Sequence, residues 1–432
     1  MITLHTFKVD VTPPIGGYLC GGLHDTALSV ETPLYLRGIA LTDGATRCVA
    51  AVIDFCYLCG TSHTRLLRAI ADGAQLEPDR VTLHSNHVHD APLIDEDAHA
   101  LVAEYAPQFQ LHDEAWFVSL LARCRDAVAQ ALADPGTPIT GVAFSSHPVE
   151  QFASTRRVLD DRGQCQVRYS VCHNPEIRSA PEGLIDPMLD QIVFYDAGNC
   201  PVACASFYAS HPQVSDGRRT VSSDTVGVAL DLFEKTNPEV FPLYFTGCGG
   251  DITAGKYSTT NKHYNRLSFG LRLFEAMQSA FDKAQPSPIG GLAWKHTTLD
   301  LPLRTIPEDA NHYADQIRSA DWRPAKYLAA MKLHRLQQNI TTYPYHLARL
   351  SFGVLDVLFL PSEMCIPYQL YAKQRCAAPL AVAAYGDSFL KYIATDEAFD
   401  QGGYEVQPNW TEIDRGVEPI LKQAMDRILR SA

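Results

Sequence analysis

Apolar runs with strand character alternate with amphipathic helical patterns along this chain. Residues 36–44 (LRGIALTDG) and 47–58 (RCVAAVIDFCYL) are typical of two buried strands joined by an Asp-Gly turn. Residues 63–77 (HTRLLRAIADGAQLE) then predict an amphipathic helix, and residues 81–88 (VTLHSNHV) predict the next strand. Because such strands need helices to cover them, the sequence predicts an α/β (α+β) fold with mixed β-sheets flanked by helices.

The same alternation continues to the end of the chain without a long linker, which indicates a single domain over residues 1–432. The stretch 305–345 is polar and helical in pattern, and it could form a lid or a subdomain. Further strands are expected in 141–152, 191–198, 200–212, 242–251 and 347–363, and further helices in 113–136, 267–284 and 412–432.

Composition excludes several classes of partner. The formal net charge is −13 and there is no run of lysine or arginine, which argues against nucleic acid. No apolar stretch approaches the roughly 18 residues of an integral membrane span. The opening MITLHTFKVD lacks the pattern of a secretory signal, so we expect a cytoplasmic protein acting on a small-molecule substrate. A homo-oligomer is compatible with the sequence.

Twelve cysteines are distributed mostly through apolar runs. Cys56 and Cys59 form a CxxC pair that could be half of a structural zinc site or a redox pair. No second CxxC completes a four-thiolate site. Free cysteine behaves as a small hydrophobe, so we predict reduced cysteines in the core.

Histidines and a glutamate follow the ends of several predicted strands. His87 and His89 end the run that begins at residue 81, His211 follows 200–210, and Glu363 follows the strand before it. Side chains at strand ends converge from distant parts of the chain, and neutral imidazole with carboxylate suits a zinc ion. If the strand continues, His87 and His89 face one way, one toward a metal and the other toward substrate.

Each of these residues also has a structural interpretation. A His-x-His pair can cap a strand or fill a polar niche, and His84 in the same segment fits a structural role better than a ligand role. His211 precedes a proline and could close a turn. Glu363 could be the carboxylate at a helix N-terminus.

The segment FTGCGGDITAGKY (245–257) places three glycines after a predicted strand and before Asp251. Glycine allows the backbone to approach a ligand closely. The segment does not match the phosphate loop GxxxxGK[ST], and GxGxxG is absent, so nucleotide binding is disfavoured. A tight strand-to-loop turn is the alternative.

The order of these motifs resembles the catalytic domain of the neutral/alkaline non-lysosomal ceramidase family. The matching segments run in the family's order from residue 8 to residue 405 and cover nearly the whole chain. They are KVDVTPPIGG with TPLYLRGIAL, SNHVHDAP, ASHPQVSDGRRTVSSD, TGCGGDITAGKY, LPSEMCIPY and DSFLKYIATDEAFDQGGYE.

This resemblance implies a zinc site. The family holds a zinc ion (Zn²⁺) with two histidines, a glutamate and a tyrosine. Matched motif by motif, these ligands fall on His87, His211, Glu363 and Tyr392. Iron or manganese could occupy the same kind of ligand set.

The resemblance also implies catalytic positions around the metal. The second histidine of the family's T-H-T-H motif falls on His89, and an active-site arginine falls on Arg156. Asp251 and Thr253 are expected to line the pocket beside the metal. Thr253 replaces the family's serine, and its extra methyl group crowds direct attack, which favours metal-activated water over an acyl-enzyme.

We therefore predict a zinc-dependent hydrolase that cleaves an amide (N-acyl) bond of a small or amphiphilic substrate. The matched segments stop before the family's C-terminal immunoglobulin-like domain, so a shorter intracellular member with a smaller substrate is expected. One alternative is a zinc-dependent hydrolase of an ester, lactone or glycosidic bond. A second alternative is a non-catalytic relative that binds a ligand and carries structural zinc.

Overall fold

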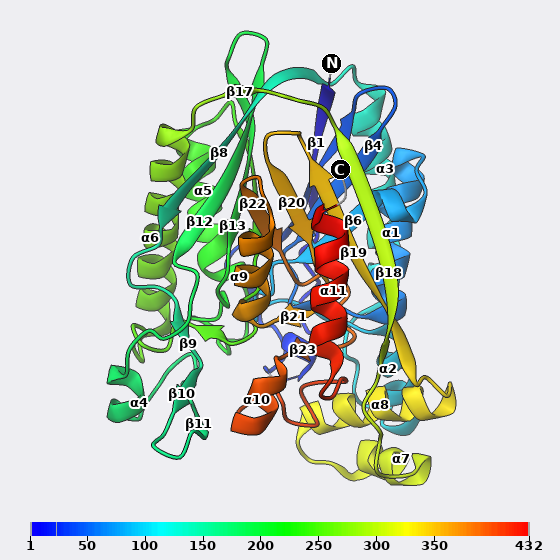
Figure 1. Ribbon diagram of the computed structural model, residues 1–432. Coiled ribbons are helices and arrows are strands. Elements are labelled where there is room, and N and C mark those ends of the chain that lie inside the picture. The colour runs from blue at the N-terminus through cyan, green and yellow to red at the C-terminus, as the bar shows by residue number, and fades with distance from the viewer. Residues whose placement is uncertain (1, 23, 431–432) are drawn as a thin grey trace.

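The largest element of the fold is a nine-stranded mixed sheet (Figure 1). The computed structural model describes residues 2–22 and 24–430. The strand order is β15-β13-β12-β8-β1-β3-β4-β6, and β17 pairs with β8. The strands are β1 (Ile2–Asp10), β3 (Tyr35–Thr42), β4 (Arg47–Ile53), β6 (Val81–Ser85), β8 (Thr137–Pro148), β12 (Met188–Asp196), β13 (Pro201–Tyr208), β15 (Phe241–Thr246) and β17 (Ser287–Pro288).

A second sheet, of four strands in the order β18-β19-β20-β22, packs against one face of the first. Alternation along β4 shows why the first sheet is buried on both sides. Val49 and Ala51 belong to the core under the helices, whereas Ala50 and Val52 belong to the core between the two sheets. The strands of the second sheet are β18 (Ala293–Pro302), β19 (Thr342–Ser351), β20 (Asp356–Phe359) and β22 (Leu380–Ala383).

Helices cover the two outer faces, so the layers run helix, sheet, sheet, helix (Figure 1). The first sheet is covered by α1 (Gly60–Ala74), α3 (Glu114–Ala133), α5 (Asp224–Thr236) and α6 (Lys262–Lys283). The second sheet is covered by α9 (Ile366–Arg375) and α11 (Val417–Arg430). This arrangement confirms the predicted mixed sheets flanked by helices.

The carboxyl ends of three parallel strand pairs define one end of the molecule. The pairs are β4 with β6, β13 with β15, and β20 with β22. Short strands extend this region, where β21 pairs with β23 and β9 with β16. The remaining elements are η1 (Cys20–Gly22), β2 (Ser29–Val30), β5 (Tyr57–Leu58), η2 (Pro78–Arg80), β7 (Leu93–Ile94), α2 (Glu96–Tyr105), β9 (Ser154–Thr155), β10 (Arg157–Leu159), β11 (Cys165–Val167), α4 (Pro175–Ser179), β14 (Thr220–Val221), β16 (Ile252–Thr253), α7 (Ala310–Ser319), α8 (Arg323–Gln337), β21 (Glu363–Met364), β23 (Tyr392–Ile393) and α10 (Asp396–Gln401).

The polar stretch 305–345 folds into α7, α8 and the start of β19. Helix α8 packs on α2 and α7, and Tyr327 and Leu328 of α8 are buried in the core shared with the second sheet. The helical pattern of this stretch is therefore present, and its role as a lid stays a prediction. Across residues 2–22 and 24–430, none of the helices combines the length and apolar character needed to cross a membrane.

Gly38 on β3 allows a cross-strand aromatic contact that tests this account of the first sheet. Gly38 pairs with Phe7 on β1, and a Cβ at position 38 would lie 2.1 Å from Cζ of the Phe7 ring. We expect Gly38→Ala to lower the free energy of unfolding by about 1–3 kcal/mol, because the ring must leave its rotamer. Urea unfolding measures the change. Gly141→Ala on β8, where the nearest atom lies at 3.4 Å, is the control; equal midpoints for the two variants would contradict the account.

Candidate active site

Four side chains from separate parts of the chain meet at the carboxyl ends of the parallel strands. His87 follows β6, His211 follows β13, Glu363 begins β21 and Tyr392 begins β23. Oε2 of Glu363 lies 3.0 Å from Nε2 of His211 and 3.3 Å from Nε2 of His87. Oη of Tyr392 lies 3.4 Å from Nε2 of His211. The structure therefore brings together all four residues that the sequence predicted as metal ligands.

The hydrogen bonds of the two imidazoles fix which nitrogen faces the cluster. Nδ1–H of His87 donates to the Cys56 carbonyl at 3.0 Å, and Nδ1–H of His211 donates to the Gly249 carbonyl at 2.7 Å. Both Nε2 lone pairs consequently point inward. Oε2 of Glu363 lies between them, is buried, and has no hydrogen-bond donor within the described part of the chain. A carboxylate and two imidazole lone pairs at this spacing fit a divalent metal ion.

Burial sets the electrostatics of the cluster. Desolvation lowers the pKa of His87 and the pKa of His211 well below the usual value. The neighbouring His89 lowers the pKa of His87 further, and Arg156 lowers that of His211 further. Desolvation also raises the pKa of Glu363 well above its usual value. The imidazoles are therefore in the neutral form that binds metals, and the carboxylate lacks a full countercharge.

Backbone strain is concentrated at the same positions. φ is +63° at His87, +62° at Ser362 and +56° at Lys391, the latter two directly before Glu363 and Tyr392. This left-handed region costs a residue with a Cβ roughly 1–2 kcal/mol. Strain of this kind gathers at functional sites, where the surrounding structure imposes it.

The expectation that His87 and His89 share a strand face is wrong. β6 ends at Ser85, because the backbone turns into the left-handed region at His87. The two rings are nevertheless adjacent, with centroids 4.7 Å apart and the Nε2 atoms 3.1 Å apart. The ring of His84 is hydrogen-bonded to the Thr82 hydroxyl and the Ala384 carbonyl, in keeping with the structural role expected for it.

Arg156 lies against the cluster. Its Nη1 donates to Oη of Tyr392 at 3.1 Å, and its Nη2 lies 3.3 Å from Nε2 of His211. Its Nε lies 4.0 Å from a carboxylate oxygen of the buried Glu405, and its guanidinium stacks over the Tyr404 ring at 5.1 Å. Burial disfavours the charged form of Arg156, but the nearby Tyr392 and Glu405 favour that form more strongly. The pKa of Arg156 is therefore raised.

Asp251 and Thr253 have different surroundings from those expected. The Asp251 carboxylate accepts the Ile366 amide at the start of α9, at 2.7 Å, and the Asp251 carbonyl accepts the Arg156 amide at 2.6 Å. Thr253 pairs with Ser154, and its buried hydroxyl has no hydrogen-bond partner among the described residues. Neither residue is among those that line the cavity beside His87. Asp251 thus holds α9 and the backbone of Arg156 in place.

A cavity of about 50 Å³ opens beside the cluster. Its walls include Tyr404 and Trp410 and side chains of α8, none of which the sequence analysis singled out. Tyr404 does lie within the matched segment 387–405, which could have identified it. The lining residues are Cys20, Cys56, Tyr57, His87, His89, Leu93, Pro324, Tyr327, Leu328, Glu363, Lys391, Tyr392, Tyr404 and Trp410.

The glycine cluster approaches protein backbone. A Cβ at Gly250 would lie 2.7 Å from the Glu363 carbonyl oxygen, and one at Gly249 would lie 3.2 Å from backbone atoms of Ser210. The Gly250 amide donates to the Met364 carbonyl at 2.9 Å. These two glycines therefore let the loop after β15 hold the segments that carry Glu363 and His211.

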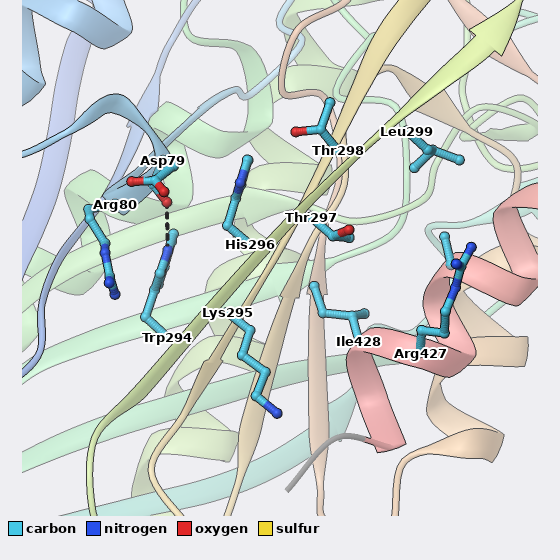
Figure 2. Close-up of a pocket in the computed structure, with 11 residues that line it drawn as sticks. Asp79, Arg80, Trp294, Lys295, His296, Thr297, Thr298, Leu299, Arg427 and Ile428 are labelled. Atoms are coloured by element: carbon cyan, nitrogen blue, oxygen red, sulfur yellow. Dashed lines mark hydrogen bonds between the residues drawn. The ribbon is translucent and has the colours of Figure 1, made fainter.

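A larger cavity, of about 670 Å³, lies elsewhere, between β18 and α11 (Figure 2). Trp294 closes one side of it by donating from Nε1 to the Asp79 carbonyl at 2.7 Å. None of the site residues predicted from the sequence lines this cavity.

Comparison with known proteins gives a structural likeness. No family model and no curated protein matches the chain. The fold matches the crystal structure of neutral ceramidase from Pseudomonas aeruginosa with a TM-score of 0.72 and 17% identity, over 99% of this chain and 73% of that one. A structure of a ceramidase complexed with C2 matches at a TM-score of 0.72 and 16% identity, over 99% and 74%. The resemblance indicated by the sequence motifs is thus confirmed, and this chain has the fold of neutral ceramidase.

Gly250 provides a test of how the site is positioned. Gly250→Ala adds a methyl group against the backbone of β21, so we expect Glu363 to be displaced. The affinity of the candidate site for a divalent metal ion should then weaken by about tenfold, the effect of disturbing the support of a ligand. Titration of the metal-free protein with zinc and a competing chelator measures the affinity. Gly17→Ala, whose nearest atom would lie at 4.0 Å, is the matched control; an unchanged affinity for Gly250→Ala would refute this role of the loop.

Proposed function

We propose that this protein is a zinc-dependent hydrolase that cleaves the amide bond of an N-acyl substrate. The observation that carries the proposal is the position of Glu363 Oε2, buried between the lone pairs of two imidazoles with no donor of its own in the described structure. The fold of neutral ceramidase and the matching motif order support the same class of reaction. His87, His211, Glu363 and Tyr392 would hold the ion.

When bound, a zinc ion supplies Lewis acidity, which makes water a nucleophile at neutral pH and polarises a carbonyl group. His89 contributes a hydrogen-bond donor. Nδ1 of His87 carries that ring's proton, so the proton in the 3.1 Å contact between the Nε2 atoms belongs to His89. A metal ion on Nε2 of His87 would take that lone pair, which leaves the His89 N–H to the substrate. In the proposed reaction, Nε2–H of His89 holds the substrate oxygen.

Arg156 supplies a fixed positive charge. The side chain is buried and is held by Tyr392, Tyr404 and Glu405, so it need not reorganise during the reaction. A preorganised cation in a water-excluded site stabilises the negative charge of a tetrahedral intermediate far more than it would in water. Arg156 is therefore proposed to stabilise the oxyanion.

The surroundings of the cluster favour water as the attacking group and an apolar acyl group as its target. The Thr253 hydroxyl is buried and has no hydrogen-bond partner among the described residues, so no neighbouring base activates it as a nucleophile. Leu93, Leu328 and Trp410 supply apolar wall, against which the hydrocarbon part of a small or amphiphilic substrate can pack.

Replacing His211 tests the metal assignment. His211→Ala removes one ligand and leaves Glu363 with less support, so zinc content should fall from about one ion per chain to near zero. Elemental analysis of the purified protein gives the ratio. His147→Ala, a half-buried histidine on β8, should keep its metal; undiminished zinc in His211→Ala would disprove the assignment.

Replacing Arg156 tests the oxyanion role. Arg156→Gln should lower kcat by about 10²–10³-fold, the usual cost of a lost oxyanion-stabilising group, while zinc content stays unchanged. Rates on N-acyl amides, esters, lactones and glycosides should be compared, with Arg162→Gln in an exposed turn as control. Cleavage of esters, lactones or glycosides without any amide cleavage would replace the proposed reaction by one of its alternatives.

A further inference from the structure

Two cysteines that are distant in the sequence meet beside the candidate metal centre. Sγ of Cys20 lies 3.2 Å from Sγ of Cys56, and both side chains are buried, at 3% and 0% exposure. Sγ of Cys20 also lies 3.6 Å from Nδ1 of His89. Both thiols line the same small cavity as His87 and His89.

The backbone fixes this juxtaposition. The amide of Cys20 donates to the Ala91 carbonyl at 2.9 Å, and the amide of Cys56 donates to the Pro92 carbonyl at 2.9 Å. Two neighbouring carbonyls of one loop therefore hold the two cysteines. φ at Cys20 is +48°, a left-handed conformation that residues with a Cβ rarely adopt without an external constraint.

The spacing of the sulfurs favours a bond between them over a second metal ion. Two thiolates on one tetrahedral zinc ion lie roughly 3.8 Å apart, given Zn–S distances of about 2.3 Å. The observed 3.2 Å is shorter than that and about 1 Å longer than a disulfide bond. His89 contacts Cys20 through Nδ1, but its Nε2 is directed at His87.

The CxxC motif is not the pair. Sγ of Cys59 lies 3.8 Å from the Tyr327 hydroxyl, on the side of α8. All twelve cysteines are free thiols in this structure, and nine of them are buried. The partner of Cys56 is therefore a residue 36 positions earlier in the chain.

We propose that Cys20 and Cys56 form an oxidisable dithiol, which closes to a disulfide on reaction with hydrogen peroxide and thereby slows the enzyme reversibly. Both sulfurs line the cavity beside the cluster, so a small oxidant that enters it meets both of them. Bond formation does not depend on the proposed function, whereas the effect on hydrolysis rests on it.

The reaction balances with peroxide as the oxidant. The Cys20 sulfur attacks one peroxide oxygen and breaks the O–O bond to give a sulfenic acid, and the leaving hydroxide takes the Cys20 proton to become water. The Cys56 sulfur then attacks the Cys20 sulfur. The S–S bond forms, the S–O bond breaks, and the leaving hydroxide takes the Cys56 proton as the second water. The two thiols are oxidised by two electrons, and the peroxide is reduced to two waters.

Closure would change the surroundings of both histidines. The Cys56 carbonyl accepts Nδ1–H of His87, so movement of Cys56 shifts the partner that orients this ring. The bond also removes the Cys20 thiol that contacts His89. Oxidation should therefore reduce hydrolysis severalfold, and dithiothreitol should restore it.

Peptide mapping of the full-length, metal-loaded protein tests the bond itself. The protein is treated with micromolar hydrogen peroxide, remaining thiols are alkylated, and non-reducing digests are analysed by mass spectrometry. Trypsin leaves Cys56 within residues 48–65 alongside two other cysteines, so chymotrypsin, which cuts after Phe55 and Tyr57, isolates it. The expected product is a linked pair of peptides, two hydrogens lighter than their sum, which dithiothreitol separates.

Variants provide the controls. Cys20→Ser and Cys56→Ser should each lose the linked peptide, whereas Cys124→Ser, a buried cysteine on α3, should retain it. Circular dichroism confirms that each variant is folded. The proposal is overturned if Cys20 and Cys56 both stay alkylatable after the exposed Cys200 has been oxidised, or if Cys20 pairs elsewhere. A linked peptide with unchanged hydrolysis would overturn the regulatory effect. The mass measurement needs no substrate, so its outcome is independent of the proposed reaction.

Discussion

The carboxylate of Glu363 imposes the strongest demand on this structure. It is 1% exposed and lies among imidazole nitrogens that present lone pairs to it. An uncompensated buried charge costs several kcal/mol, a large part of the roughly 5–15 kcal/mol that holds a typical domain together. Binding of zinc at a structural site can contribute on the order of 10 kcal/mol to the free energy of folding. The same ion that would activate water would therefore also offset the cost of burying its own ligand, and metal binding and folding should be coupled.

The fold brings the four candidate metal ligands together at the ends of strands. Each of the two histidines follows a strand of a parallel pair, and Glu363 and Tyr392 lie on a third, short parallel pair, β21 with β23. The left-handed backbone at or directly before three ligand positions turns the chain sharply where each side chain must face inward. Gly250 has no Cβ, and a Cβ at this position would clash with the backbone of β21. Packing of the two sheets supplies the stability that sustains this strain.

The sequence pattern predicted mixed sheets flanked by helices, and the resemblance of its motifs implied which four side chains meet, because those signals are local. Alternation and amphipathic periodicity identify β3, β4 and α1, and the order of short motifs identifies His87, His211, Glu363 and Tyr392. Contacts across the chain leave no periodic signal. The meeting of Cys20 with Cys56, the support of Arg156 by Glu405 and the binding of Asp251 to the α9 amide all depend on how loops cross at the strand ends. The strand assumed for His87 and His89 failed for a related reason, since a tertiary turn overrides the local preference.

One metal ion is expected to occupy the space between the two Nε2 atoms and Glu363. Anomalous diffraction on either side of the zinc absorption edge, from crystals of the zinc-loaded protein, locates the ion directly. We expect a single strong peak at about 2.0–2.3 Å from the ligand atoms of His87, His211 and Glu363. A zinc peak at the thiols of Cys20 and Cys56 alone, or no peak among the three ligands despite stoichiometric zinc in the sample, would contradict it.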